Sequence, residues 1–88
     1  MEPIQISKKT EGAAEWEYAV LLGHDSDDIG FLVKVDQEYW IQLTNGRISP
    51  EILIKRSFRF LLQKQSKYSI PRSFDLRDIQ HRFPDFRI

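Results

Sequence analysis

The sequence predicts an α+β fold in a single domain, residues 1–88, with a strand-rich region at 1–35 and a helical region at 36–88. In the first region apolar residues alternate with a period of two, which is typical of half-buried strands. In the second region they recur at helical spacing behind capping residues. With 88 residues, 41% of them hydrophobic, the chain is long enough for one core and too short for two.

Three strands are predicted in the first region. A short first strand contains Ile4 and Ile6, and the next two cover residues 16–22 and 29–35. The alternation places large apolar side chains on one face, at Trp16, Tyr18, Val20, Leu22, Ile29, Phe31, Val33 and Val35. The positions between them hold Glu17, Ala19, Leu21, Gly30, Leu32 and Lys34. Polar loops at 9–14 and 23–28 suit hairpins, so we expect an antiparallel meander. If the third strand is an exposed edge, two copies can pair their sheets.

Residues 37–44 are predicted as a helix. Asp36 is a suitable N-cap, and Asn45-Gly46 supplies a stop. The alternative is a fourth strand, because apolar residues also alternate here, at Tyr39, Ile41 and Leu43.

A longer helix is predicted from Pro50 to about Gln65. Ser49 can cap it, Pro50 fits the first helical position, and Glu51 favours the positive end of the helix dipole. Its expected buried stripe contains Leu53, Ile54, Phe58, Phe60, Leu61 and Leu62. The opposite side carries Lys55, Arg56, Arg59 and Gln63.

The C-terminal region predicts a polar segment at 66–73 and a last, short helix. Asp75 is the expected cap of this helix, with Asp78 three residues later, and Pro84 stops it at Phe83. Two or three helices should therefore gather on one face of the three-stranded meander. Phe83 and Phe86 have two interpretations, as the closure of the core or as exposed anchors for a partner.

The charges divide unequally along a chain whose net charge is zero. Residues 1–46 hold three basic and nine acidic residues, a net charge of −6, and residues 47–88 hold ten basic and four acidic residues, a net charge of +6. Such an asymmetry predicts a basic surface that attracts an anionic partner. The alternative is that the two halves neutralise each other within one domain or between two copies.

The sequence supports no catalytic or cofactor chemistry. It has no cysteine, no glycine-rich phosphate loop and no Gly-x-Ser-x-Gly elbow. His24 and His81 lack a second histidine at the spacing of helical zinc sites. Positions 1, 3, 6 and 12 of a calcium loop match Asp25, Asp27, Gly30 and Asp36. Ile29 stands where such a loop needs an oxygen ligand, so a solvated hairpin loop is the favoured interpretation, and we expect no metal, no cofactor and no enzyme activity.

Binding to another macromolecule remains as the expected function. The predicted partner is another protein or a second copy of the chain in a homodimer, contacted through basic residues at Lys55, Arg56, Arg59, Lys64, Lys67 and Arg72. The alternative is weak nucleic-acid binding by the same residues of the basic helix 50–65 and the loop that follows. No apolar run reaches about 18 residues and no secretory signal is visible, so we expect a cytoplasmic protein without a membrane partner.

The segment 46–86 carries a block of short motifs. They are Ser49-Pro50-Glu51, Arg56-Ser57-Phe58, Phe60-Leu61-Leu62, Ser73-Phe74-Asp75-Leu76, Ile79 and Phe83-Pro84. In this block the chain resembles a group of small uncharacterised prokaryotic proteins with no assigned activity. The resemblance implies a bacterial cytoplasmic origin and the helical half of the fold, and it implies no mechanism.

Overall fold

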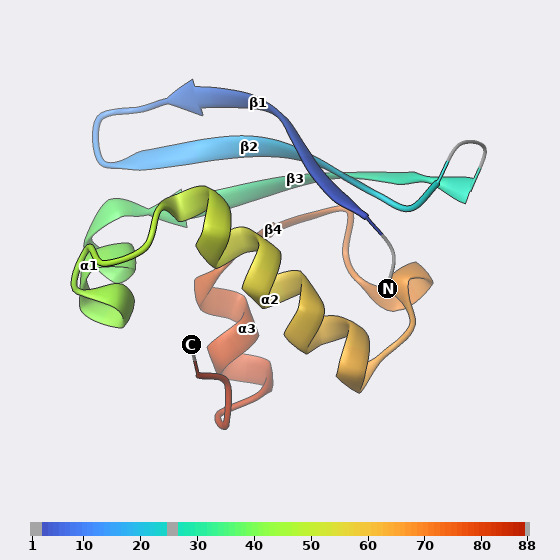
Figure 1. Cartoon of the computed structure of the whole chain (residues 1–88). Helices are drawn as coiled ribbons and strands as arrows, with labels where there is room; N and C mark the ends of the chain where they lie inside the picture. The colour runs from blue at the N-terminus through green and yellow to red at the C-terminus, as the bar shows by residue number, and fades with distance from the viewer. Residues whose placement is uncertain (1–2, 25–26, 88) are drawn as a thin grey trace.

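The computed structural model is a two-layer α+β structure with a β-sheet above and helices below it (Figure 1). It describes residues 3–24 and 27–87, with the backbone alone for Lys8. The sheet has four strands in sequence order, and the helices lie against one of its faces (Figure 1). The predicted fold class is therefore confirmed, although the sheet has one strand more than the predicted meander.

The first three strands form the expected antiparallel meander of β1 (Ile4–Glu11), β2 (Glu15–Leu22) and β3 (Ile29–Asp36). β1 is longer than predicted and runs through the first half of the segment expected to be a loop, residues 9–11 of 9–14. The reason is a β-bulge at Ser7, after which pairing with β2 resumes at Lys8. Because a bulge shifts the alternation by one residue, the second half of this strand did not match a period of two.

Residues 37–44 form helix α1 (Gln37–Thr44), so the helix prediction is confirmed and the alternative of a fourth strand is wrong. Asp36 caps the helix, because its Oδ2 accepts a hydrogen bond of 2.9 Å from the Tyr39 amide. At the other end Asn45 adopts the left-handed conformation with φ of 56°, and Gly46 follows with φ of 70°. These local signals outweigh the alternation of the apolar residues.

The long helix α2 (Pro50–Lys64) matches its prediction to within one residue. The Ser49 hydroxyl accepts from the Ile52 amide at 3.2 Å, as expected of a cap. Ser57 is buried in the stripe and was not predicted there. Its hydroxyl donates to the Leu53 carbonyl at 2.8 Å, which satisfies the buried polar group.

The polar segment after α2 contains a 3-10 turn, η2 (Lys67–Ser69), and then a strand that the sequence did not predict, β4 (Ser73–Asp75). This strand runs parallel to β3. The Leu32 amide donates to the Arg72 carbonyl at 2.8 Å, and the Leu76 amide donates to the Lys34 carbonyl at 3.0 Å. The third strand is therefore not an edge, and the condition for edge pairing between two copies is not met there.

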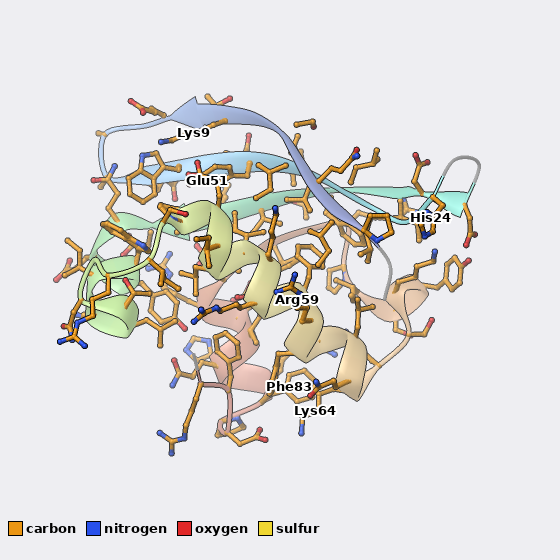
Figure 2. All side chains as sticks on the ribbon, viewed as in Figure 1. Lys9, His24, Glu51, Arg59, Lys64 and Phe83 are labelled. Atoms are coloured by element: carbon orange, nitrogen blue, oxygen red, sulfur yellow. The ribbon has the colours of Figure 1, made fainter. Side chains whose placement is uncertain are left out.

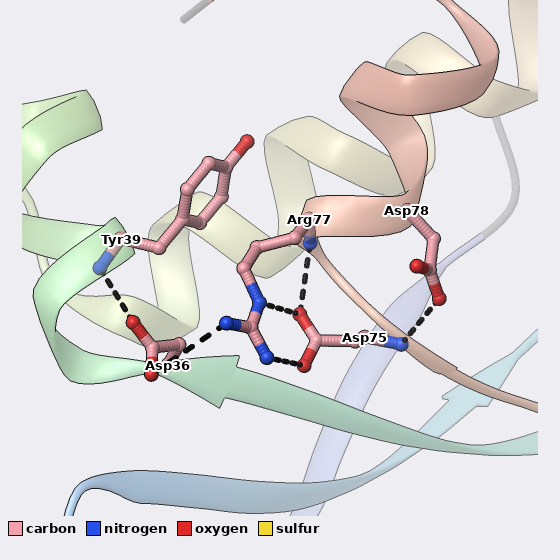
Figure 3. Close-up of polar contacts among 5 residues, drawn as sticks. All are labelled: Asp36, Tyr39, Asp75, Arg77 and Asp78. Atoms are coloured by element: carbon pink, nitrogen blue, oxygen red, sulfur yellow. Dashed lines mark hydrogen bonds and ion pairs between the residues drawn. The ribbon is translucent and has the colours of Figure 1, made fainter.

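The last helix, α3 (Arg77–Arg82), begins two residues after the predicted cap. Asp75 still performs the capping from the end of β4, because its Oδ1 accepts from the Arg77 amide at 2.9 Å. Asp78 reaches back and accepts from the Asp75 amide at 3.3 Å, which completes a reciprocal capping arrangement (Figure 3). The helix stops one residue before Phe83-Pro84, close to the predicted end.

The core lies between the sheet and the helices. The ring of Phe58 on α2 is fully buried, with centroids 5.2 Å from Phe31 on β3 and 5.8 Å from Phe74 on β4. Phe86 is 2% exposed, and its ring lies 5.0 Å from that of Phe60. Phe83 also contacts Phe60, at 5.8 Å, so the C-terminal aromatic residues close the core and are not exposed anchors.

Candidate functional site

The outer side of α2 carries three of the basic residues predicted to contact a partner. Arg56 and Arg59 are exposed and Lys55 is half-buried, and Arg59 lies near the middle of the helix (Figure 2). Ile52, which is 44% exposed, shares a helical stripe with both arginines. Within the described ranges Lys55 and Arg56 form no ion pair, and together with the exposed Ile52 they give this side of α2 a basic surface.

The other three predicted residues do not extend that face. Lys64 pairs with Asp85 at 3.2 Å near the C-terminal segment (Figure 2). Lys67 is 7% exposed, and its Nζ donates to the Asp27 carboxylate at 2.9 Å and to the Asp27 carbonyl at 3.0 Å. Arg72 lies beside the opposite face of the sheet. The six residues therefore do not form one continuous face.

The acidic loop between β2 and β3 contacts η2 through the hydrogen bonds of Asp27 with Lys67 and Tyr68. The hydrogen bonds from Lys67 and Tyr68, together with the positive charge of Lys67, hold the pKa of Asp27 below its usual value. Of the residues that match positions of a calcium loop, Gly30 and Asp36 belong to β3, whereas Asp25 lies outside the described residues. In the described part of the chain, no three His, Cys, Asp or Glu side chains gather in a group that could hold a metal ion.

The charge asymmetry of the sequence becomes a difference between layers. The acidic half forms the three long strands and α1, and the basic half forms α2, α3 and the short strand β4 (Figure 1). Among the described residues two ion pairs join the halves, Lys67 with Asp27 and Arg77 with Asp36 at 4.0 Å. Within the described residues, the two halves therefore neutralise each other directly at these two ion pairs.

The outer face of the sheet, the one turned away from the helices, has an apolar end. Four register pairs of β2 and β3 share this face: Glu15 with Asp36, Glu17 with Lys34, Ala19 with Leu32, and Leu21 with Gly30. Leu32 is 46% exposed, and an added Cβ at Gly30 would meet nothing within 4 Å. A shallow hollow of about 400 Å³ lies here, lined by Ala19, Leu21, Gly30, Leu32, Ser7 and Arg72. We call the surface formed by Ala19, Leu21, Gly30 and Leu32 the apolar patch.

The neighbouring end of the same face carries charged residues, and hydrogen bonds and ion pairs hold them in place. Arg77 forms two side-chain hydrogen bonds with Asp75, of 3.1 and 2.8 Å, and approaches Asp36 at the start of α1 (Figure 3). Burial raises the pKa of the Asp75 carboxyl, but the hydrogen bonds and charge of Arg77 outweigh it, so the pKa lies below its usual value. This network fastens β4 and α3 to the sheet, which is a structural role.

Comparison with known proteins adds no relative. No family model, no curated protein and no solved structure matches the chain. The resemblance of the C-terminal block to small prokaryotic proteins therefore stays a prediction. Within residues 3–24 and 27–87, no helix combines the length and the apolar character needed to cross a membrane.

The apolar patch is the surface that the sequence interpretation missed. A signal was present, because Leu21 and Leu32 occupy strand positions where an exposed face usually carries polar residues. The alternation placed them on the outer face, but it did not show whether a helix covers that face as well.

Proposed function

We propose that the chain is a non-catalytic, cytoplasmic protein-interaction module that forms a homodimer through the outer face of its sheet. The observation that carries the proposal is the apolar patch, because no described element covers it although the other face is sealed by helices (Figure 1). An exposed apolar surface with a polar rim marks an interaction site in many proteins.

The register of β2 and β3 favours a second copy as the partner. When two sheets stack face to face about a two-fold axis that runs along the strands between β2 and β3, each residue meets its own register partner from the other copy. Glu17 then faces Lys34, and an acid meets a base. Leu32 faces Ala19 and Leu21 faces the open space at Gly30, so a large side chain meets a small one each time. At these three register pairs the surface is complementary to itself in charge and in shape. At the end of the strands, Glu15 meets Asp36, and this pair of acids opposes the contact.

The size of this surface determines the expected affinity of the dimer. Three strands of eight residues give a face of roughly 26 by 14 Å. Contact over this area is at the small end of specific interfaces, so we expect a dissociation constant on the order of 10 µM.

Sedimentation velocity over a wide concentration range tests the proposal. The wild-type chain should change from monomer to dimer with rising concentration, and Leu32→Glu should stay monomeric because it buries an unpaired carboxylate at the patch. Ile41→Glu is the matched control, since Ile41 is 53% exposed on α1 and lies off the interface. A wild-type chain that stays monomeric, or equal effects of the two substitutions, would contradict the proposal.

A second candidate function uses the basic face of α2. Ile52 within the stripe of Arg56 and Arg59 favours an acidic protein over nucleic acid, because phosphate contacts need no apolar residue. Two separate titrations, each at two salt concentrations, distinguish an acidic protein partner from nucleic acid. One uses a synthetic acidic peptide that contains a single leucine, and the other uses a DNA duplex. The charge-reversed Arg56→Glu and the Ile52→Ser variant should both weaken the peptide complex. Loss with Arg56→Glu alone, on DNA and with a steep salt dependence, would favour nucleic acid.

A further inference from the structure

A second cavity, of about 300 Å³, lies on the helix side of the molecule. It is formed where the end of α2 meets residues 70–74 and α3. Most of its wall is apolar and comes from Leu61, Ile70, Pro71, Phe74, Ile79 and Phe83. Polar side chains complete the lining, at Gln65, Ser73, Asp78, His81 and Arg82. Pockets with an apolar wall and a few polar groups are typical of small-molecule sites, and this volume is at the small end of their range.

Two opposite charges lie on α3 at the rim of this cavity. Asp78 and Arg82 are one helical turn apart, and both side chains are exposed. An acid and a base at this spacing often pair. Among the residues that the structure describes, however, no ion pair joins them to each other or to any other side chain. Both charges are therefore open to a ligand.

Two lining residues hold the Arg82 guanidinium at the cavity. Its Nη2 atom donates to Oε1 of Gln65 at 3.2 Å, and its Cζ atom lies 5.5 Å from the ring centroid of Phe83. The Nε2 atom of Gln65 is buried and takes no part in the site. Within residues 3–24 and 27–87, Nε and Nη1 of Arg82 donate no hydrogen bond, so these donors are available to a ligand.

The Asp78 carboxylate lies where α3 meets β4 (Figure 3). Its Oδ2 atom accepts from the Asp75 amide at 3.3 Å, and this amide belongs to the peptide bond that joins Asp75 to the lining residue Phe74. Oδ1 accepts no hydrogen bond from any residue in the described part of the chain. A ligand with a single charge is attracted by either Asp78 or Arg82 and repelled by the other, whereas a zwitterion satisfies both.

We propose that this cavity binds a free α-amino acid with an apolar side chain, such as phenylalanine. The ligand carboxylate accepts from the Arg82 guanidinium, and the ligand ammonium donates to the Asp78 carboxylate. The apolar side chain replaces water against Leu61, Phe74 and Ile79. An α-amino acid carries its two charged groups on one carbon atom, so it fits between opposite charges that are one helical turn apart. Because both charged contacts lie at an exposed rim, we expect a dissociation constant on the order of 1 mM.

Amide-proton NMR of the full chain, titrated with three related compounds, tests the assignment. Phenylalanine should shift the backbone amides of Phe74, Ile79 and Phe83. Hydrocinnamate is phenylalanine without the amino group, and phenethylamine is phenylalanine without the carboxylate. Each should bind about fivefold more weakly, because each loses one exposed charged contact. Equal affinities of the three compounds, or no shift with any of them, would overturn the proposal.

Two substitutions separate the charged contacts from folding. Asp78→Asn keeps an acceptor for the Asp75 amide but removes the charge, so phenylalanine should bind about fivefold more weakly. Hydrocinnamate has no ammonium group and should bind no more weakly to this variant. Arg82→Gln should weaken phenylalanine to the same extent and should not weaken phenethylamine, which has no carboxylate. Equal losses for all three compounds, or unchanged phenylalanine binding in both variants, would contradict the assignment.

Each pocket variant has a matched control that removes a charge of the same sign elsewhere. Arg56→Gln on α2 is the control for Arg82→Gln, and Glu38→Gln on α1 is the control for Asp78→Asn. Both positions are exposed, and neither lines the cavity. The controls should leave phenylalanine binding unchanged. A fivefold loss in the controls as well would show a general effect of net charge and would overturn the assignment of Asp78 and Arg82.

This inference is independent of the proposed dimer. The cavity lies on the helix side, and the apolar patch lies on the other face of the sheet. Leu32→Glu should therefore leave phenylalanine binding unchanged, and Asp78→Asn should leave self-association unchanged. A failure of one proposal does not weaken the other.

Discussion

On β2 and β3, the side chains turned toward the helices are sealed: Tyr18 and Val33 are 0% exposed and Val20 is 2% exposed. On the opposite face of the same strands Leu32 is 46% exposed, next to Ala19 and Gly30. Both faces carry apolar residues, and they differ in what covers them. The difference teaches that a substitution on the inner face should act on folding, whereas one in the apolar patch should act on association.

The largest expected effect comes from the inner face. Phe58→Ala removes a fully buried ring that contacts Phe31 and Phe74, and should lower the free energy of unfolding by about 3–5 kcal/mol. Leu32→Ala, on the outer face, should change it by about 0.5 kcal/mol or less at concentrations where the chain is monomeric. Urea unfolding of both variants measures the contrast, and similar losses would show that the outer face is also part of the core.

A substitution at the charged end of the outer face should lower the free energy of unfolding, as a substitution on the inner face does. Asp75→Asn removes the negative charge and the Oδ2 acceptor of the Arg77 Nη2 hydrogen bond, keeps the Oδ1 acceptor, and should cost about 1–2 kcal/mol of unfolding free energy. The pKa of Asp75 lies below its usual value of 3.8 in the folded state. Its contribution is therefore complete above that value and is lost as the pH falls through the lower, folded pKa.

Urea unfolding at a series of pH values, from neutral to below the usual pKa of an aspartate, checks this prediction. The wild type should lose more stability on acidification than Asp75→Asn, because the variant has already lost the titrating group. Parallel pH profiles for the two proteins would remove Asp75 from the acid-sensitive contacts.

The substitution with the smallest expected effect on folding separates the roles of the two faces most clearly. Gly30→Val should leave monomer stability unchanged or raise it by up to about 1 kcal/mol, because a glycine inside a strand is unfavourable and space for a Cβ is available. The same side chain fills the hollow that Leu21 of the second copy would enter. Thermal unfolding in dilute solution and sedimentation at high concentration should show a stable monomer that no longer dimerises. Dimerisation of a folded Gly30→Val chain at the wild-type concentration would count against this packing.

The parts of the fold that the sequence predicted rest on local signals. Ser49 and Asp36 cap their helices, Asn45 ends α1, and the alternation on β2 and β3 defines the inner face. The missed parts depend on contacts between distant residues. β4 has only three residues and exists because β3 offers its edge, about 40 residues earlier in the chain.

The candidate sites were less predictable than the fold. Lys67 reads as a solvated cation in the sequence, but Asp27 reaches it from 40 positions away and the folded chain buries it. Gln65 carries no signal of its own in the sequence, because the burial of its Nε2 atom depends on the residues packed around it. The charge pattern and the periodicity of the sequence assign residues to one face of an element. They do not show whether another element covers that face, because this depends on how the elements pack.

A charge-swap experiment tests the two-fold stacking of the outer faces most directly. Glu17→Lys and Lys34→Glu each place like charges opposite each other in a homodimer, so each variant alone should sediment as a monomer. An equimolar mixture restores an acid opposite a base at both contacts and should form a heterodimer with an affinity close to that of the wild-type dimer. A mixture that stays monomeric while the wild-type chain dimerises would contradict the stacking of β2 on β3.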